Sequence, residues 1–299
     1  MATPAETPKY ALEVNGVHAR YGSVQALTSV SFGLTPGVIC ALVGQNGSGK
    51  STLMKSIMGS VRHGGDITIL GQSGARARKA GLVGYVPQNE GVDWAFPVSV
   101  QEVVTMGRYG FMGPTRRARA EDREAVRHAL DMVEMTPYAE RQIGSLSGGQ
   151  RKRVFIARAI AQGAQLMLLD EPFAGVDKPS ETMIIALLQK LAASGVTILV
   201  ATHDLAGLPQ LCSEVLLLNR RVIFHGPVAE AMKPEHLMQA FGVVPDHGEP
   251  EPGANPAADP ATASATDPAA DPATASASDS ATNPATNPAT QLRKAKENR

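Results

Sequence analysis

The feature that most constrains the fold of this chain is the segment at residues 44–51, GQNGSGKS. It matches the pattern G-x-x-x-x-G-K-[ST], follows the apolar run VICALV and precedes residues that favour a helix. Its glycines allow backbone N–H groups to surround a phosphate, Lys50 supplies a positive charge and the Ser51 hydroxyl can bind Mg²⁺. We therefore expect a strand–loop–helix unit that binds a nucleotide. The predicted binding residues are Gly44, Gln45, Asn46, Gly47, Ser48, Gly49, Lys50, Ser51 and Thr52.

A second anion-binding segment, LSGGQ, follows about a hundred residues later. Its two glycines open an Arg-rich amphipathic helix, GGQRKRVFIARAIAQ, so backbone N–H groups are available at the positive end of the helix dipole. Because the chain already has one phosphate loop, we expect this segment to contact a nucleotide bound by a second copy. The sequence therefore predicts a homodimer with ATP at its interface. The predicted contact residues are Leu146, Ser147, Gly148, Gly149 and Gln150.

Two adjacent carboxylates end the apolar run LMLLDE, at Asp170 and Glu171. A buried strand with charged residues at its exit is common in any protein. After a phosphate loop, however, Asp170 is expected to join the Mg²⁺ coordination sphere through water, and Glu171 to act as the general base that polarises the attacking water.

The order of apolar runs predicts an α/β fold with a P-loop NTPase core. Short strands with one helix come first, then a helical region at about residues 89–163, then alternating strands and helices. We expect a mixed, mainly parallel sheet flanked by helices, with a hairpin at Asn219–Arg220 that adds an antiparallel element. We also expect an antiparallel β subdomain and an inserted helical subdomain. The predicted boundaries are a flexible N-terminus at 1–8, a folded domain at 9–245 and a disordered tail at 246–299.

That tail is rich in Ala, Pro, Thr, Ser and Asp, and DPATASA occurs in it twice. It carries almost no large apolar side chains, which disfavours ordering. The repeat could be a binding array, but we interpret the segment as a solvated tail.

Composition narrows the function. The chain has 28 basic and 28 acidic side chains, and this balance argues against nucleic acid as a partner. The run RKR at 151–153 is interpreted as the solvated face of a helix.

Neither a signal-like apolar region nor a membrane-span-length run is visible, so we expect the chain to stay in the cytoplasm. Cys40 and Cys212 lie in apolar settings, and we interpret them as core residues rather than as a disulfide or metal site.

Taken together and in this order, GQNGSGKST, LSGGQ and LMLLDEP resemble the nucleotide-binding subunit of ATP-binding cassette (ABC) transporters, over about residues 9–245. The resemblance implies that Tyr21 stacks on adenine, that Gln88 approaches Mg²⁺ and the water, and that His203 contacts the γ-phosphate. It also implies that Asp177 lies in a dimer-contact loop. The pair of subunits would close on two ATP molecules and reopen after hydrolysis, at the cytoplasmic face of the membrane.

A narrower resemblance lies in VDWAFPVSVQEVVTMGRYG and DEPFAGVDKPSE, which are similar to the ATPases of manganese, zinc and iron importers. It implies a separate transmembrane permease and, indirectly, an extracytoplasmic metal-binding protein. The aromatic residues in and just after the first segment could fill the helical subdomain or line a groove that receives a permease helix. These residues are Trp94, Phe96, Tyr109 and Phe111.

Two other functions stay open at this point. The chain could be the ATPase of another ABC importer or exporter. It could also be a soluble ABC ATPase in DNA repair or translation, although such proteins usually carry two cassettes or a long coiled-coil insertion, and neither is evident here.

Overall fold

Continuous apolar runs form the centre of the fold. In the computed structural model, which describes residues 8–88 and 97–241, every residue of Ile39–Val43, Leu166–Asp170 and Thr197–Thr202 is buried. Strands covered on both faces are typical of a parallel sheet in an α/β protein. All described residues fall in one unit that spans Met1–His247.

This central sheet has six strands in the order β10-β9-β3-β8-β7-β6. Neighbours from β9 to β6 run parallel, and β10 pairs antiparallel with β9 through the predicted hairpin. The strands are β3 (Ile39–Val43), β6 (Val83–Val86), β7 (Leu166–Asp170), β8 (Thr197–Thr202), β9 (Glu214–Asn219) and β10 (Arg221–Pro227).

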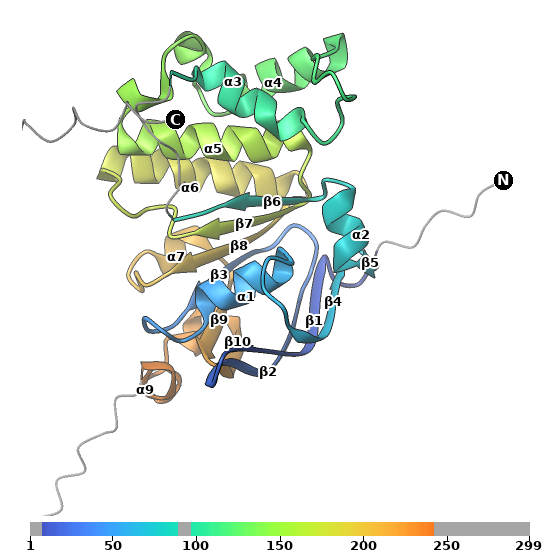
Figure 1. Cartoon of the computed structure of the whole chain (residues 1–299). Coiled ribbons are helices and arrows are strands. Elements are labelled where there is room, and N and C mark those ends of the chain that lie inside the picture. The colour runs from blue at the N-terminus through green and yellow to red at the C-terminus, as the bar shows by residue number, and fades with distance from the viewer. Residues whose placement is uncertain (1–7, 89–96, 242–299) are drawn as a thin grey trace, which may run out of the picture. The chain divides into compact units, whose positions relative to one another are not determined.

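A second, antiparallel sheet has the order β2-β1-β4-β5. It lies at the lower right in Figure 1, beside α1 and the lower strands of the central sheet. Its strands are β1 (Leu12–Tyr21), β2 (Val24–Leu34), β4 (Gly64–Ile69) and β5 (Gln72–Ser73).

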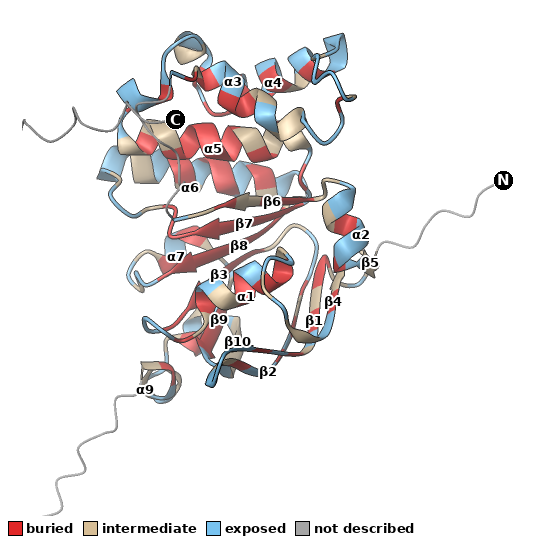
Figure 2. Ribbon diagram, in the orientation of Figure 1, coloured by how far each residue is buried: buried red, intermediate tan, exposed pale blue. Residues whose placement is uncertain are grey.

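Helices cover both faces of the central sheet. One apolar cluster joins α3, α4, α5 and α6 to one face, and a second joins α1 and the antiparallel sheet to the other. Figure 2 shows these inward-facing residues as buried. The longer helices are α1 (Lys50–Ile57), α4 (Ala120–Met132), α5 (Gly148–Gln162), α6 (Lys178–Ala193) and α9 (Pro234–Phe241). The shorter ones are α2 (Gly74–Lys79), α3 (Val100–Thr105), α7 (Leu208–Leu211) and α8 (Val228–Ala231).

The carboxyl ends of the parallel strands lie at one edge of the sheet, on the left in Figure 1, and α1, α5 and α6 all begin there. In open α/β sheets, ligands bind beyond this edge. The fold therefore brings the phosphate loop and the LSGGQ segment to the same side of the domain.

The predicted fold class is confirmed: an α/β domain with a mixed sheet, an antiparallel sheet and a helical region. Within the helical region, α3 is short: it ends at Thr105 and a 3₁₀ turn follows. No helix within the described residues is long and apolar enough to cross a membrane. The predicted tail at 246–299, and all but the last residue of the predicted N-terminal segment 1–8, lie outside the described residues.

Candidate functional site

The phosphate loop joins the end of β3 to the start of α1. Gly49 has φ of 101°, in the left-handed region that favours glycine, and a β-carbon there would lie 2.7 Å from the Ala26 carbonyl oxygen. The turn therefore requires glycine both for its backbone angle and for the close approach of β2. The ammonium of Lys50 donates to the carbonyl oxygens of Gly44 at 2.6 Å and Gln45 at 3.1 Å.

Lys50 is 8% exposed, and burial lowers the pKa of its ammonium from the ordinary value. The nearby carboxylates of Glu171 and Asp170 act in the opposite direction and favour the charged form. A positive charge in such a setting is poorly hydrated, which strengthens its attraction for a phosphate.

An open cavity of about 750 Å³ surrounds this loop. Most of the predicted nucleotide-binding residues line it, together with four residues predicted to act in hydrolysis. The lining residues predicted from the sequence are Gly44, Gln45, Asn46, Gly47, Gly49, Lys50, Ser51, Thr52, Gln88, Asp170, Glu171 and His203. Sequence reasoning missed five others: Val24, Gln25, Ala26, Arg220 and Phe241.

Arg220 connects three parts of the site through its peptide groups. Its backbone N–H donates to the Ser48 carbonyl at 2.8 Å, and its carbonyl accepts from the Thr28 N–H at 2.6 Å. Ser48 itself is buried and does not line the cavity. The β9–β10 turn thus links the phosphate loop to β2 of the other sheet.

Asp170 and Glu171 differ in their surroundings. Asp170 ends β7 with 5% of its surface exposed, and its carboxylate accepts from the Tyr85 hydroxyl at 3.5 Å. Burial and the Asp170 carboxylate raise the pKa of Tyr85 to about 12. Tyr85 therefore stays protonated and can donate to Asp170 throughout the physiological pH range.

Glu171 adopts a left-handed backbone conformation, with φ of 50°. Its N–H donates to the Ala201 carbonyl of β8 at 3.0 Å, and its Oε2 lies 2.9 Å from Nδ1 of His203. The Glu171 side chain is 11% exposed and that of His203 is 72% exposed. This arrangement holds a carboxylate at the cavity wall, where it could accept a proton from a water molecule.

The chain's own oxygen donors fit a bound Mg²⁺. Ser51, Gln88 and Asp170 all line the same cavity, and hydroxyl, amide and carboxylate oxygens are the hard donors that Mg²⁺ prefers.

The LSGGQ segment forms the start of α5 and does not line this cavity. Ser147 is the N-cap: its hydroxyl accepts from the Gln150 N–H at 3.3 Å, and the Gln150 side chain accepts from the Ser147 N–H at 3.0 Å. Leu146 is buried. Gly149 has a packing role, because a β-carbon there would lie 2.4 Å from the Ser180 β-carbon of α6.

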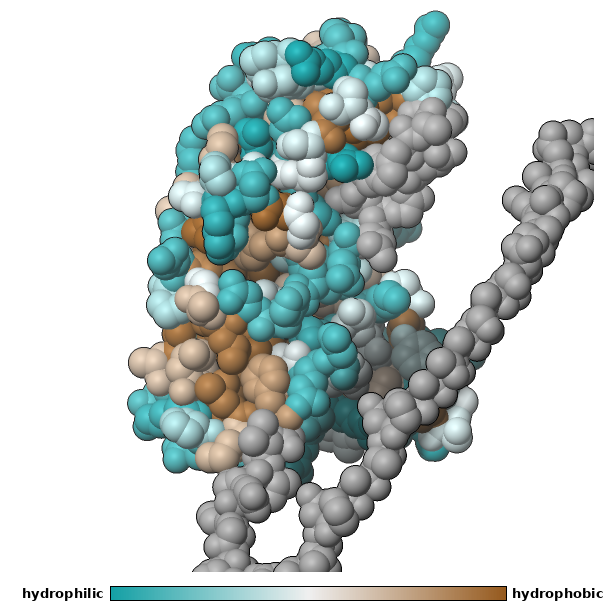
Figure 3. All heavy atoms as spheres, turned by 90° about the vertical axis from the view of Figure 1, so that its left-hand side faces the viewer, coloured by the Kyte–Doolittle hydropathy of each residue, from teal (hydrophilic) through white to brown (hydrophobic). Residues whose placement is uncertain are grey.

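Figure 3 views the domain from the side where both motifs lie, and hydrophilic side chains cover much of the described surface there. Asp177 lies on this side at the start of α6, where its carboxylate accepts from the Ser180 N–H at 2.9 Å and from the Ser180 hydroxyl at 3.1 Å. These hydrogen bonds lower the pKa of Asp177, and the residue is the N-cap of α6.

Tyr21 lies at the end of β1, is 50% exposed and is not among the cavity-lining residues. Tyr109 and Phe111 are also exposed, and each has an arginine guanidinium over its ring. These two aromatic side chains therefore do not fill the core of the helical region. Trp94 and Phe96 lie outside the described residues.

Comparisons with a family model, with known sequences and with solved structures all indicate the same family. Residues 27–174 match the family described as ABC transporter. The manganese transport system ATP-binding protein MntA of Synechocystis sp. is 48% identical over 78% of this chain and 91% of its own length. The chelated iron transport system membrane protein YfeB of Yersinia pestis is also 48% identical, over 79% of this chain and 80% of its own length.

The zinc transport system ATP-binding protein TroB of Treponema pallidum is 42% identical over 78% of this chain and 93% of its length. Among solved structures, an inward-facing transporter assigned to the metal-chelate ABC type has a TM-score of 0.69 and 32% identity, over 78% of this chain and 89% of that one. The phosphate loop, the acidic strand end and LSGGQ thus lie on one domain of this fold. The chain belongs to the ABC transporter family: it is the ATP-binding, ATP-hydrolysing component, which works with membrane permease components.

Proposed function

We propose that this chain powers the import of a divalent metal ion, manganese, zinc or iron, through a separate membrane permease. The observation that carries the proposal is the 48% identity to a manganese transport system ATP-binding protein over 91% of that protein's length. Relatives named for iron and zinc transport, at 48% and 42% identity, support the same class of cargo.

In the proposed hydrolysis step, the phosphate loop and Lys50 hold the β- and γ-phosphates. Ser51 and Gln88, with Asp170 through water, would hold Mg²⁺, which would neutralise part of the phosphate charge. Glu171 accepts a proton from the attacking water. His203 orients the Glu171 carboxylate through the 2.9 Å contact and reaches the γ-phosphate. Tyr21 stacks on the adenine.

The proposed working unit is a homodimer. Leu146, Ser147, Gly148, Gly149 and Gln150 of one subunit contact the ATP held by the other, and Asp177 contributes to the interface. Two observations support this: LSGGQ does not line the cavity of its own subunit, and α1 and α5 begin at the same edge of the sheet. ATP binding closes the dimer and hydrolysis reopens it.

The permease is proposed to bind the helical region at the cytoplasmic face of the membrane. Trp94, Phe96, Tyr109 and Phe111 would contact it, and the exposure of Tyr109 and Phe111 supports this role. An extracytoplasmic metal-binding protein would deliver the ion to the permease.

Uptake of radioactive Mn²⁺, Zn²⁺ and Fe²⁺ in cells that lack this chain tests the proposal. We expect uptake of one of the three ions to fall at least tenfold, and the wild-type chain to restore it. Glu171→Gln should not restore it, although it is produced in the same amount. Unchanged uptake of all three metals in the deletion strain would contradict metal import.

A further inference from the structure

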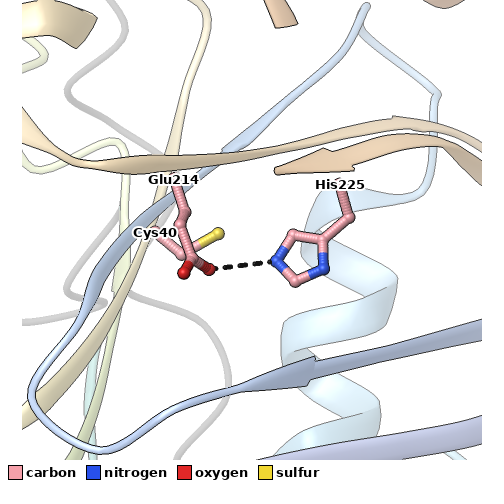
Figure 4. Close-up of side chains that lie close together, drawn as sticks. All are labelled: Cys40, Glu214 and His225. Atoms are coloured by element: carbon pink, nitrogen blue, oxygen red, sulfur yellow. Dashed lines mark hydrogen bonds and ion pairs between the residues drawn. The ribbon is translucent and has the colours of Figure 1, made fainter. Parts of the chain in front are cut away.

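Three side chains with metal-binding donors lie together between the two sheets, away from the nucleotide cavity. They are Cys40 of β3, Glu214 of β9 and His225 of β10, and their donor atoms all lie within 4.8 Å of one another. In Figure 4 the thiol, the carboxylate and one nitrogen of the imidazole point toward one another. The three residues are far apart in the sequence and meet only because of the strand order.

Strand register explains why they share one face. Cys40 and Glu214 are direct partners in the parallel pairing of β3 with β9. His225 is opposite Leu216 in the antiparallel pairing of β10 with β9, so it lies diagonal to Glu214 on the same face. The ring of Phe32, from β2, packs edge-on against the His225 ring at 6.0 Å.

We propose that Cys40, Glu214 and His225 form a binding site for a borderline-soft divalent cation such as Zn²⁺. Thiolate and imidazole donors favour Zn²⁺ over Mg²⁺ or Ca²⁺, and three protein ligands with one water complete a tetrahedral shell. A cysteine that serves only as a core residue needs no such neighbours. The sequence-based interpretation of Cys40 as a core residue holds, since the residue is fully buried, and the proposal adds a metal-binding role to it.

The distances require a modest adjustment of the thiol. In a tetrahedral Zn²⁺ site the sulfur lies about 3.6 Å from a nitrogen ligand, and a nitrogen lies about 3.3 Å from an oxygen ligand. Nε2 of His225 is already 3.2 Å from Oε2 of Glu214. The side chains of His225 and Glu214 are 23% and 30% exposed, which gives an ion a route from solvent to the buried thiol.

Charge balance also favours the site. Binding breaks the S–H bond: the sulfur electron pair goes to the metal and one proton goes to the solvent. One thiolate and one carboxylate then balance the two positive charges of the ion, and His225 binds as neutral imidazole.

Co²⁺, which replaces Zn²⁺ and has a thiolate charge-transfer absorption in the near ultraviolet, provides the test. Because the chain has two cysteines and neither lines the nucleotide cavity, this absorption reports a thiolate site alone. The full chain is titrated with Co²⁺ in excess Mg²⁺, which occupies the oxygen-lined cavity. We expect the absorption to saturate at one ion per chain and to disappear on addition of Zn²⁺.

Matched variants identify the ligands. Cys212→Ala should keep the absorption, and Cys40→Ala should abolish it. Glu214→Gln and His225→Gln should weaken Co²⁺ binding at least tenfold, and they keep the test decisive if Cys40→Ala does not fold. ATP hydrolysis at the wild-type rate identifies folded variants. No absorption in the wild type, absorption that survives Cys40→Ala, or unchanged affinity in folded Glu214→Gln and His225→Gln would overturn the proposal.

Discussion

The Nδ1 atom of His203 lies 2.9 Å from Oε2 of Glu171, at the ends of two neighbouring parallel strands. The Glu171 N–H also donates to the Ala201 carbonyl of β8. The backbone of β8 therefore holds the main chain of Glu171, and His203, which follows β8, contacts the carboxylate. A carboxylate oriented in this way is prepared to accept a proton without a costly rearrangement.

Replacing Glu171 by Gln should lower the ATP hydrolysis rate about 10²–10⁴-fold, because the amide cannot accept the proton from water. ATP affinity should change little, since the phosphate loop is intact. Phosphate release and nucleotide binding measure the two effects. The matched control is Glu181→Gln, a partly buried carboxylate outside the cavity that pairs with Lys178, and this variant should hydrolyse ATP normally. Full activity in Glu171→Gln would refute the general-base role.

The LSGGQ segment should act on the partner subunit's nucleotide. A Lys50→Ala subunit mixed with a Ser147→Ala subunit should regain roughly a quarter of the wild-type ATPase rate, because half of randomly mixed symmetric dimers have one intact site of two. Each variant alone should be inactive. A mixture no more active than its components would exclude this scheme.

Gly149 should be needed for packing of α5 against α6. Gly149→Ala brings a β-carbon within 2.4 Å of the Ser180 β-carbon, which should cost about 1–3 kcal/mol of unfolding free energy through overpacking. Gly110→Ala, where no atom lies within 4 Å, should unfold like the wild type. The double variant Gly149→Ala, Ser180→Gly should recover part of the loss in urea denaturation. Wild-type stability of Gly149→Ala alone would contradict this.

Asp122 should stabilise the helical region in a pH-dependent way. It accepts from the Arg119 N–H at 3.0 Å and from the Arg108 guanidinium at 3.0 Å, and these contacts hold its pKa below the usual value. Because the folded-state pKa lies below the unfolded value of about 3.9, the stabilisation is complete above that pH and is lost as the pH falls through the folded-state pKa.

Asp122→Asn should therefore lower the unfolding free energy by about 2 kcal/mol at pH 7, and by progressively less below about pH 4. Urea denaturation across this range measures the difference between the variant and the wild type. Glu124→Gln, which removes an exposed partner of Arg127 on the same helix, should leave the midpoint unchanged. A difference that stays constant down to the lowest pH would rule out the ionised carboxylate as its cause.

The local motifs predicted most of the residues that the fold brings to one cavity, because a phosphate loop and an acidic strand end carry their chemistry in consecutive residues. Arg220, Phe241 and the start of β2 could not be predicted, since nothing in their local sequence indicates a ligand. They reach the cavity only through the strand order of the central sheet and the position of the second sheet.

The candidate metal site at Cys40 could not be predicted for a related reason. An apolar strand around a cysteine predicts burial, and Cys40 is fully buried. Its polar neighbours, however, come from β9 and β10, and only the pairing of distant strands brings them beside it.

The peptide groups of Arg220 give the phosphate loop a measurable dynamic property. Since they join Ser48 of the loop to Thr28 of β2, fraying of the β9–β10 turn would break both links together. The amide hydrogens of Thr28 and Arg220 should then exchange with solvent deuterium at similar rates. Bound nucleotide, which is surrounded by the same segments, should slow both exchanges to the same degree.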